Sequence, residues 1–157
     1  MRVRQIMHRT VKTCRLDDDL QSVAMIMWNE DCGAVPIVDD EGHAIGLLTD
    51  RDIAMAAALY HRPLWDIGAR EVKPKDHVCS CRASDDVRVA LRTMGEERVR
   101  RLLVLSESNR IEGIVALKDV LDNIVTGRNG AAGEPSSGEA LHTLRTICRP
   151  IALPGVV

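Results

Sequence analysis

The sequence repeats itself. When the chain is compared with itself at an offset of 67 residues, its two halves superpose without a gap, so that Cys14 meets Cys81 and Asp52 meets Asp119. A chain of 157 residues can form one ordinary domain or two small units that share a core. The duplication therefore predicts that both halves adopt one small fold and pack together with pseudo-twofold symmetry.

Each half predicts the order strand, helix, strand, strand, helix. An alternating run at residues 10–15 or 77–82 indicates a short strand, and a helix capped by Asp17 or Ser84 follows it. Apolar runs at 34–38 and 102–105, each with a polar turn and a return strand at 45–49 or 112–116, favour a hairpin. A second helix ends each half.

Apolar residues at 3–4 spacing predict one buried face on each helix. These residues are Leu20, Val23, Ala24, Met27 and Trp28, then Ile53, Ala56, Ala57 and Tyr60, and in the second half Val87, Ala90, Leu91 and Met94, then Val120, Leu121, Ile124 and Val125.

The fold class expected is therefore α/β (α+β), with two tandem βαββα repeats. We expect a first repeat with its N-terminal lead-in at residues 1–62, a second repeat at 63–126, and a Gly/Ser-rich linker with a C-terminal tail at 127–157. Residues 139–157 regain apolar side chains and predict a short docked helix followed by a tail. Because units this small leave a surface open, we also expect a homodimer.

Composition narrows the function classes. The 21 basic residues nearly cancel the 23 acidic residues, which disfavours a nucleic-acid or anionic membrane partner. Residues 1–7 lack a following apolar h-region, and no run reaches the roughly 18 apolar residues of a membrane span, so we expect a cytoplasmic protein. Five cysteines do not make a disulfide framework, and most are expected to be small core residues.

Two segments carry a family resemblance. Gly33-Ala34-Val35-Pro36-Ile37-Val38 and Gly46-Leu47-Leu48-Thr49-Asp50-Arg51-Asp52, with their offset partners, resemble tandem cystathionine-β-synthase (CBS) domains, the pair called a Bateman module, over about residues 3–126. The segment 147–153 is similar to the tails of small stand-alone two-CBS bacterial proteins of the hypoxic-response type, which implies a role in stress response.

The resemblance implies a regulatory sensor that is not an enzyme. Such modules bind AMP, ADP, ATP or S-adenosylmethionine between the repeats, as a regulatory ligand and not as a cofactor, and dimerise as a flat disc. The partners expected are thus a second copy, an adenosyl small molecule and an unidentified protein effector. No catalytic triad, phosphate loop or dinucleotide fingerprint points to catalysis.

The family's ligand motif, Gly, two apolar residues, Thr or Ser, two residues, Asp, fits Gly46, Thr49 and Asp52. A glycine permits close approach, and a hydroxyl beside free helix amides can hold a phosphate. A carboxylate three residues later can accept bonds from two ribose hydroxyls, and Arg51 can add positive charge. Thr49 and Asp52 also have the spacing of a helix capping box. Capping alone could therefore explain both residues, and this alternative stays open.

Further site residues follow from the resemblance. Thr10, Val11 and Lys12 with Gly33, Ala34, Val35 and Pro36 are expected to line the first cleft, although as core strand residues they need no ligand. A candidate second site holds Val78, Arg101, Lys118 and Asp119. Because Ala116 replaces the motif hydroxyl there, the second site is expected to be weak, altered or empty, and a scaffold with vestigial clefts is the rival function.

Three other clusters of polar residues have more than one interpretation. His77, Cys79 and Cys81 alternate along a strand, and a thiol or zinc sensor is a second alternative, although no fourth ligand is evident and no metal site is predicted. Arg98, Arg100 and Arg101 either contact a polyphosphate or form a solvated loop. Asp17, Asp18 and Asp19 precede a helix and favour capping over catalysis. The histidines, at 8, 43, 61, 77 and 142, show no ligand spacing.

Overall fold

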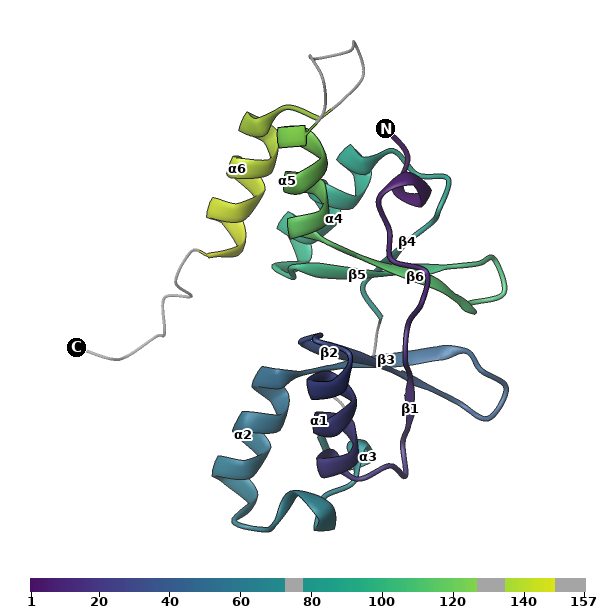
Figure 1. Ribbon diagram of the computed structural model, residues 1–157, viewed down its shortest axis with the longest axis vertical. Coiled ribbons are helices and arrows are strands. Elements are labelled where there is room, and N and C mark those ends of the chain that lie inside the picture. The colour runs from purple at the N-terminus through teal and green to yellow at the C-terminus, as the bar shows by residue number, and fades with distance from the viewer. Residues whose placement is uncertain (73–77, 127–134, 149–157) are drawn as a thin grey trace, which may run out of the picture.

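Each half of the chain forms its own three-stranded sheet with helices packed on one side (Figure 1). The computed structural model describes residues 1–72, 78–126 and 135–148. In Figure 1 the two sheets lie in the middle, with the helices of the first half below and those of the second half above. The expected α/β class with two βαββα repeats is confirmed.

The elements recur in the same order in both repeats. The first repeat contains β1 (Cys14–Arg15), α1 (Leu20–Asn29), β2 (Ala34–Val38), β3 (Ala44–Thr49) and α2 (Asp50–Tyr60). The second contains β4 (Ser80–Cys81), α4 (Val87–Glu97), β5 (Arg101–Leu105), β6 (Ile111–Ala116) and α5 (Leu117–Thr126). Outside this pattern are η1 (Val3–Gln5), η2 (Leu64–Asp66), α3 (Ala69–Val72) and α6 (Ser137–Ile147).

The two sheets share one register. In each, the first strand is parallel to the second, and the second is antiparallel to the third. Pro36 pairs with Leu47, and the residues 67 positions later, Leu103 and Ile114, pair in the same way. A shift in the pairing register also occurs at the same place in both sheets, between Ile37 and Val38 and between Val104 and Leu105. The duplication therefore holds at the level of single hydrogen-bonded pairs.

The lead strands are much shorter than the predicted runs at 10–15 and 77–82. Only Cys14–Arg15 and Ser80–Cys81 pair with a neighbouring strand. The chain turns immediately afterwards, because Asp18 accepts the Arg15 backbone N–H (2.8 Å) and Asp85 accepts the Arg82 N–H (2.7 Å). Residue 77 lies outside the described residues.

The predicted helix caps, Asp17 and Ser84, are wrong by two residues. Asp19 caps α1 by accepting the Ser22 backbone N–H at 2.9 Å, and Asp86 caps α4 by accepting the Arg88 N–H at 3.0 Å. These backbone hydrogen bonds are the main reason that the pKa values of both carboxyl groups lie below their ordinary range. The correct caps are related by the 67-residue offset.

Each repeat has its own core between its helices and its sheet. Leu20, Val23, Val35 and Leu48 are fully buried in the first core. The buried helix faces expected from the sequence were too wide in this repeat, since three of the residues assigned to them are exposed. These are Trp28, which is 82% exposed, Tyr60, which is 40% exposed, and Ala57.

The connecting segments cross between the repeats. Val3 before the first repeat is fully buried in the second core, and its backbone N–H donates to Asp85 O at 3.0 Å. Ile67 and Ala69, in the segment that connects the first repeat to the second, are fully buried in the first core. Each repeat thus completes the other, and the lead-in runs along the second sheet, where His8 bridges Ile114.

The predicted C-terminal helix is present as α6, which packs on α4 and α5 (Figure 1). Ala140 is fully buried, and the Thr143 hydroxyl donates to the α4 carbonyl of Leu91 at 3.5 Å. The remainder of the predicted tail, 149–157, lies outside the described residues. All five cysteines are free thiols, with Cys14 and Cys81 buried. No helix in the described ranges has the length and apolarity to cross a membrane.

Candidate ligand-binding site

The junction between β3 and α2 is closed by a reciprocal pair of side chains. The Thr49 hydroxyl accepts the Asp52 backbone N–H at 3.3 Å, while Asp52 Oδ2 accepts the Thr49 backbone N–H at 2.8 Å and its hydroxyl at 2.7 Å. This is the capping box that the spacing allows. Among the described residues, the hydrogen bonds to this carboxylate go to Oδ2, which leaves Oδ1 available to a ligand hydroxyl.

A cavity of about 530 Å³ opens beside this junction. Its wall on the first repeat is the end of β3 and the first turn of α2, and its wall on the second repeat is the segment before β4 and the turn before β5. The lining residues are Gly46, Leu47, Thr49, Asp50, Arg51, Asp52, Val78, Cys79, Arg98, Val99, Arg100, Arg101 and Ile147. The volume falls within the range of small-molecule sites, and residues from both repeats line it.

Three arginines of the second repeat face this motif of the first. Arg98 ends α4 in a left-handed conformation (φ 53°), and Arg100 and Arg101 lead into β5. Arg100 donates to Cys148 Sγ at 3.9 Å, a weak contact at the end of α6. The sequence suggested these three arginines as a contact for a polyphosphate without placing them at this cleft, and it assigned Arg101 to the other cleft. It did not predict Cys79 or Ile147 as lining residues.

The structure brings together some of the predicted site residues. Gly46, Thr49, Arg51 and Asp52 line the cavity, and so do Val78 and Arg101 from the candidate second site. Gly33 adjoins it, since a Cβ atom on this glycine would lie 3.1 Å from both Arg101 Nη2 and Asp50 Oδ2.

The other residues expected in the first cleft lie elsewhere. Ala34, Val35 and Pro36 are buried strand residues, whereas Thr10, Val11 and Lys12 lie before β1, with Lys12 paired to Glu30 at 3.7 Å. None of these six is among the lining residues of the cavity.

The corresponding junction in the second repeat is already engaged. Asp119 Oδ2 accepts the Ala116 backbone N–H at 2.7 Å, and Asp119 Oδ1 lies 3.0 Å from His8 Nε2. The His8 backbone lies so close to Gly113 that a Cβ there would be 2.6 Å from His8 O. Lys118 pairs with Asp122. A ligand at this second cleft would have to displace His8 from Asp119.

The cysteines of the proposed thiol site occupy different environments. Desolvation by burial raises the pKa of the Cys81 thiol to about 12. Because a thiol that stays protonated is a poor nucleophile and a poor metal ligand, Cys81 suits neither role. Cys79 instead lines the cavity and donates to Glu97 Oε2 at 3.8 Å. The third member, His77, lies outside the described residues.

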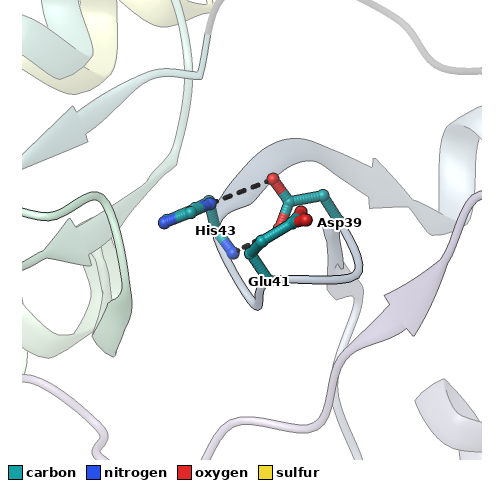
Figure 2. A group of neighbouring side chains, drawn as sticks. All are labelled: Asp39, Glu41 and His43. Carbon is teal, nitrogen blue, oxygen red and sulfur yellow. Dashed lines mark hydrogen bonds and ion pairs between the residues drawn. The ribbon is translucent and has the colours of Figure 1, made fainter.

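The β2–β3 turn gathers three polar side chains that sequence reasoning overlooked (Figure 2). Possible ligand atoms of Asp39, Glu41 and His43 lie within 4.8 Å of one another. Asp39 accepts the His43 backbone N–H at 2.7 Å and lies 3.1 Å from its ring Nδ1. Burial raises the pKa of Asp39, but these hydrogen bonds outweigh it, so the pKa lies below its ordinary value. The bonds close the hairpin, which accounts for the cluster.

Comparison with known proteins finds relatives of about the same length as this chain and relatives that are much longer. Hypoxic response protein 1 of Mycobacterium tuberculosis is 29% identical over 150 residues, which is 96% of either chain. Inosine-5'-monophosphate dehydrogenase of Methanocaldococcus jannaschii is 29% identical over 119 residues. That match covers 74% of this chain but only 22% of the dehydrogenase. The shared unit thus occurs alone and inside a longer protein.

Solved structures of similar fold include proteins with bound ligands. The CBS domain pair of protein MJ0100, in complex with 5'-methylthioadenosine and S-adenosyl-L-methionine, has a TM-score of 0.74 at 21% identity, covering 82% of this chain and 98% of that one. CBS domain protein PAE2072 from Pyrobaculum aerophilum, complexed with AMP, has a TM-score of 0.69 at 18% identity, covering 76% and 90%.

A further structure, Hypoxic Response Protein I with two coordinated zinc ions, has a TM-score of 0.69 at 30% identity and covers 78% of this chain and 98% of that one. The sequence model of the CBS domain matches this chain twice, at residues 3–59 and 69–126, which together make up more than half of it. The repeat found in the sequence, the paired sheets and the fold comparison agree with this match. The chain belongs to the CBS-domain family and carries two tandem copies of the domain.

Proposed function

We propose that this protein is a regulatory, non-catalytic module that binds an adenosine-containing ligand in the cavity beside Thr49 and Asp52. The observation that carries the proposal is the composition of that cavity, where the ligand motif of one repeat meets three arginines of the other. The complexes of MJ0100 with S-adenosyl-L-methionine and of PAE2072 with AMP support the class of ligand.

The ribose would be held by Asp52. Its Oδ2 closes the helix cap, so the free lone pairs of Oδ1 can accept hydrogen bonds from vicinal ribose hydroxyls while the cap stays intact. A phosphate would bind near Thr49 and the first amides of α2, where the helix dipole favours negative charge. Capping and ligand binding are therefore compatible roles of the same two residues.

Binding would link the repeats. Because the cavity is lined by α2 and β3 on one side and by residues 98–101 on the other, a ligand that contacts both sides favours one relative geometry of the repeats. Such a change can be read by another protein only if the ligand discriminates between two geometries. The rival function, a scaffold with vestigial clefts, fits the second cleft, where His8 already engages Asp119.

A thermal-shift panel of AMP, ADP, ATP, S-adenosylmethionine, NAD and GTP tests the proposal. Ligand at about 100 times its dissociation constant adds roughly 2.7 kcal/mol, which raises the melting temperature of a protein of this size by several degrees. We expect adenosyl compounds to raise the melting temperature and GTP to leave it unchanged. If no adenosyl compound shifts a folded wild-type protein, the scaffold function replaces this proposal.

The matched variants are Asp52→Glu and Asp119→Glu. Glutamate is a normal capping-box residue, so Asp52→Glu keeps the cap while moving the carboxylate by one methylene. We expect it to abolish the ligand shift with little change in the unliganded melting temperature. Asp119→Glu makes the same change in the second cleft and should leave the ligand shift intact.

We also propose that the protein dimerises through the outer face of α1 and α2. Helix α1 contains no charged residue, and α2 contains none after Asp52, yet the face exposes Met25, Trp28, Met55, Leu59 and Tyr60. A groove of about 260 Å³ runs between the helices beside Trp28. Asp50 is the charged residue in the lining of this groove. Exposed apolar patches of this kind mark interaction sites, and an apolar face can pair with the same face of a second copy in a twofold dimer.

The second repeat explains why one face alone is open. By the 67-residue offset, Trp28 corresponds to Gly95 and Ala24 to Leu91. At those positions α6 covers α4, since Thr143 donates to Leu91 O and its Cγ2 lies 3.9 Å from a Cβ built on Gly95. The α4–α5 face is thus covered by the chain's own helix, while the α1–α2 face is left for a second copy.

A further inference from the structure

We propose that the cavity selects adenosine nucleotides with two or three phosphates over AMP and S-adenosylmethionine, and that Arg98, Arg100 and Arg101 make the selection. The inference rests on the proposed function and adds the class of ligand to it. It follows from three observations: the charge of the cavity wall, the comparison of the two repeats, and the position of the arginines relative to Asp52.

The cavity wall carries more positive than negative charge. Four arginines are among its lining residues, Arg51, Arg98, Arg100 and Arg101, against two aspartates, Asp50 and Asp52. Within residues 1–72, 78–126 and 135–148, none of these arginines has a carboxylate oxygen within 4.0 Å. Guanidinium groups bind phosphate oxygens through two parallel hydrogen bonds, so a wall of this kind suits a ligand with several phosphates.

The fold itself does not require the three arginines. Their counterparts in the first repeat, at the 67-residue offset, are Asp31, Gly33 and Ala34. Asp31 (φ 48°) and Arg98 (φ 53°) have the same left-handed backbone, so the two turns have one conformation. The same turn therefore folds with one negative charge in the first repeat and three positive charges in the second. The charge is a property of this cleft, not of the turn.

The arginines lie across the cavity from the ribose-binding carboxylate. With a ribose on Asp52 and a first phosphate near Thr49, further phosphates extend along the wall formed by residues 98–101. AMP has no group that reaches beyond the first phosphate. S-adenosylmethionine would bring its positive sulfonium toward the guanidinium groups, which is unfavourable in a partly enclosed cavity.

Isothermal titration calorimetry at fixed ionic strength, with adenosine, AMP, ADP, ATP and S-adenosylmethionine as ligands, tests the proposal. We expect ADP and ATP to bind about tenfold or more tightly than AMP, because each charged hydrogen bond is worth more than a factor of ten. The preference should weaken as salt is raised. S-adenosylmethionine should bind more weakly than AMP.

The variants replace each arginine by the residue that the first repeat uses at the same place, which the fold tolerates there. These are Arg98→Asp, Arg100→Gly and Arg101→Ala, singly and combined. We expect the combined variant to bind ATP no more tightly than AMP while adenosine binds as in the wild type. Arg92→Ala, an exposed arginine of α4 outside the cavity lining, is the control and should keep the preference for ATP.

The outcomes separate the two proposals. If AMP or S-adenosylmethionine binds wild type as tightly as ATP, or if the combined variant keeps the preference, the selection by arginines is overturned and the adenosyl site stands. If inorganic tripolyphosphate binds as tightly as ATP, adenosine adds nothing and the inference fails as well. If no adenosyl compound binds, both proposals fail.

Discussion

Single residues distinguish the two clefts. Thr49 and Asp52 were identified from the sequence because their types and spacing are those of a ligand motif, and the structure places them on a cavity wall. For the second cleft, Ala116 predicted a weak, altered or empty site, but the contact of His8 with Asp119, 111 residues away in the chain, could not be predicted. Such a pairing depends on the path of the lead-in, which has no local sequence signal.

The contribution of the helix caps to stability can be tested by single substitutions. We expect Asp86→Ala to lower the free energy of unfolding by about 1 kcal/mol, because the Arg88 backbone N–H loses its acceptor. Ser84→Ala, at the cap expected from the sequence, should change it by less than about 0.5 kcal/mol. Urea denaturation measures both. Equal losses in the two variants would contradict the assignment of the cap.

The same cap predicts a pH dependence. Hydrogen bonding lowers the pKa of Asp86 in the folded state, so the ionised carboxylate stabilises the fold. The difference in stability between wild type and Asp86→Ala should be fully present above the unfolded pKa of about 4 and should fall as pH drops through the lower folded pKa. Denaturation at several pH values measures it, and a difference that grows on acidification would contradict the prediction.

The thiols make a further residue-scale prediction. Cys14 and Cys81 are buried, and desolvation raises the pKa of each to about 12. We therefore expect an alkylating reagent to modify the exposed Cys148 first and to leave Cys14 and Cys81 unmodified until the protein is unfolded. Mass spectrometry of peptides reports each site. Rapid modification of Cys81 in the folded protein would revive the thiol-sensor hypothesis.

For the secondary-structure elements, the internal repeat predicted most of the strands and helices that the structure contains. The order of strands and helices could be read from the sequence because hydrophobic periodicity and turn residues are local signals that occur twice. The width of the buried helix faces could not be predicted, since Trp28 and Tyr60 are residue types of a core and yet are exposed in this chain. Residue type alone does not distinguish a core position from an exposed one.

Dimerisation through the exposed α1–α2 face can be tested by placing one charged residue on it. We expect Trp28→Glu to convert a dimer to a monomer, because a carboxylate would be buried in an uncharged interface. Leu141→Glu is the control, since Leu141 is a 55% exposed apolar residue on α6, away from that face. Sedimentation equilibrium measures the mass. A wild-type monomer, or a dimer that both variants preserve, would contradict the proposed interface.

At the scale of the whole molecule, the two repeats are interlocked. Val3 is buried in the second core and Ile67 in the first, so neither repeat is complete without a segment from the other side. Thr10, Val11 and Lys12 were assigned from the sequence to the cleft of their own repeat, whereas the cavity is lined by Val78 and Cys79, the counterparts of Val11 and Lys12 in the other repeat. Crossing of this kind is a property of the assembled pair and not of either copy.

The end of α6 connects the cavity to the surface. Ile147 lines the cavity and Arg100 contacts Cys148, so a ligand that engages Arg100 changes the surroundings of the last turn of this helix. We expect nucleotide binding to alter hydrogen exchange in the last turn of α6 more than in α1, whose outer face lies away from the cavity. Mass spectrometry measures the exchange, and equal changes in both helices would argue against this route.

A crystal structure of the protein grown with ATP would show directly whether a nucleotide binds between the repeats. We expect one nucleotide in the cavity between the repeats, with its ribose hydroxyls on Asp52 and its phosphates against Arg98, Arg100 and Arg101. A nucleotide found instead beside His8 and Asp119, or on the surface away from both clefts, would contradict this expectation.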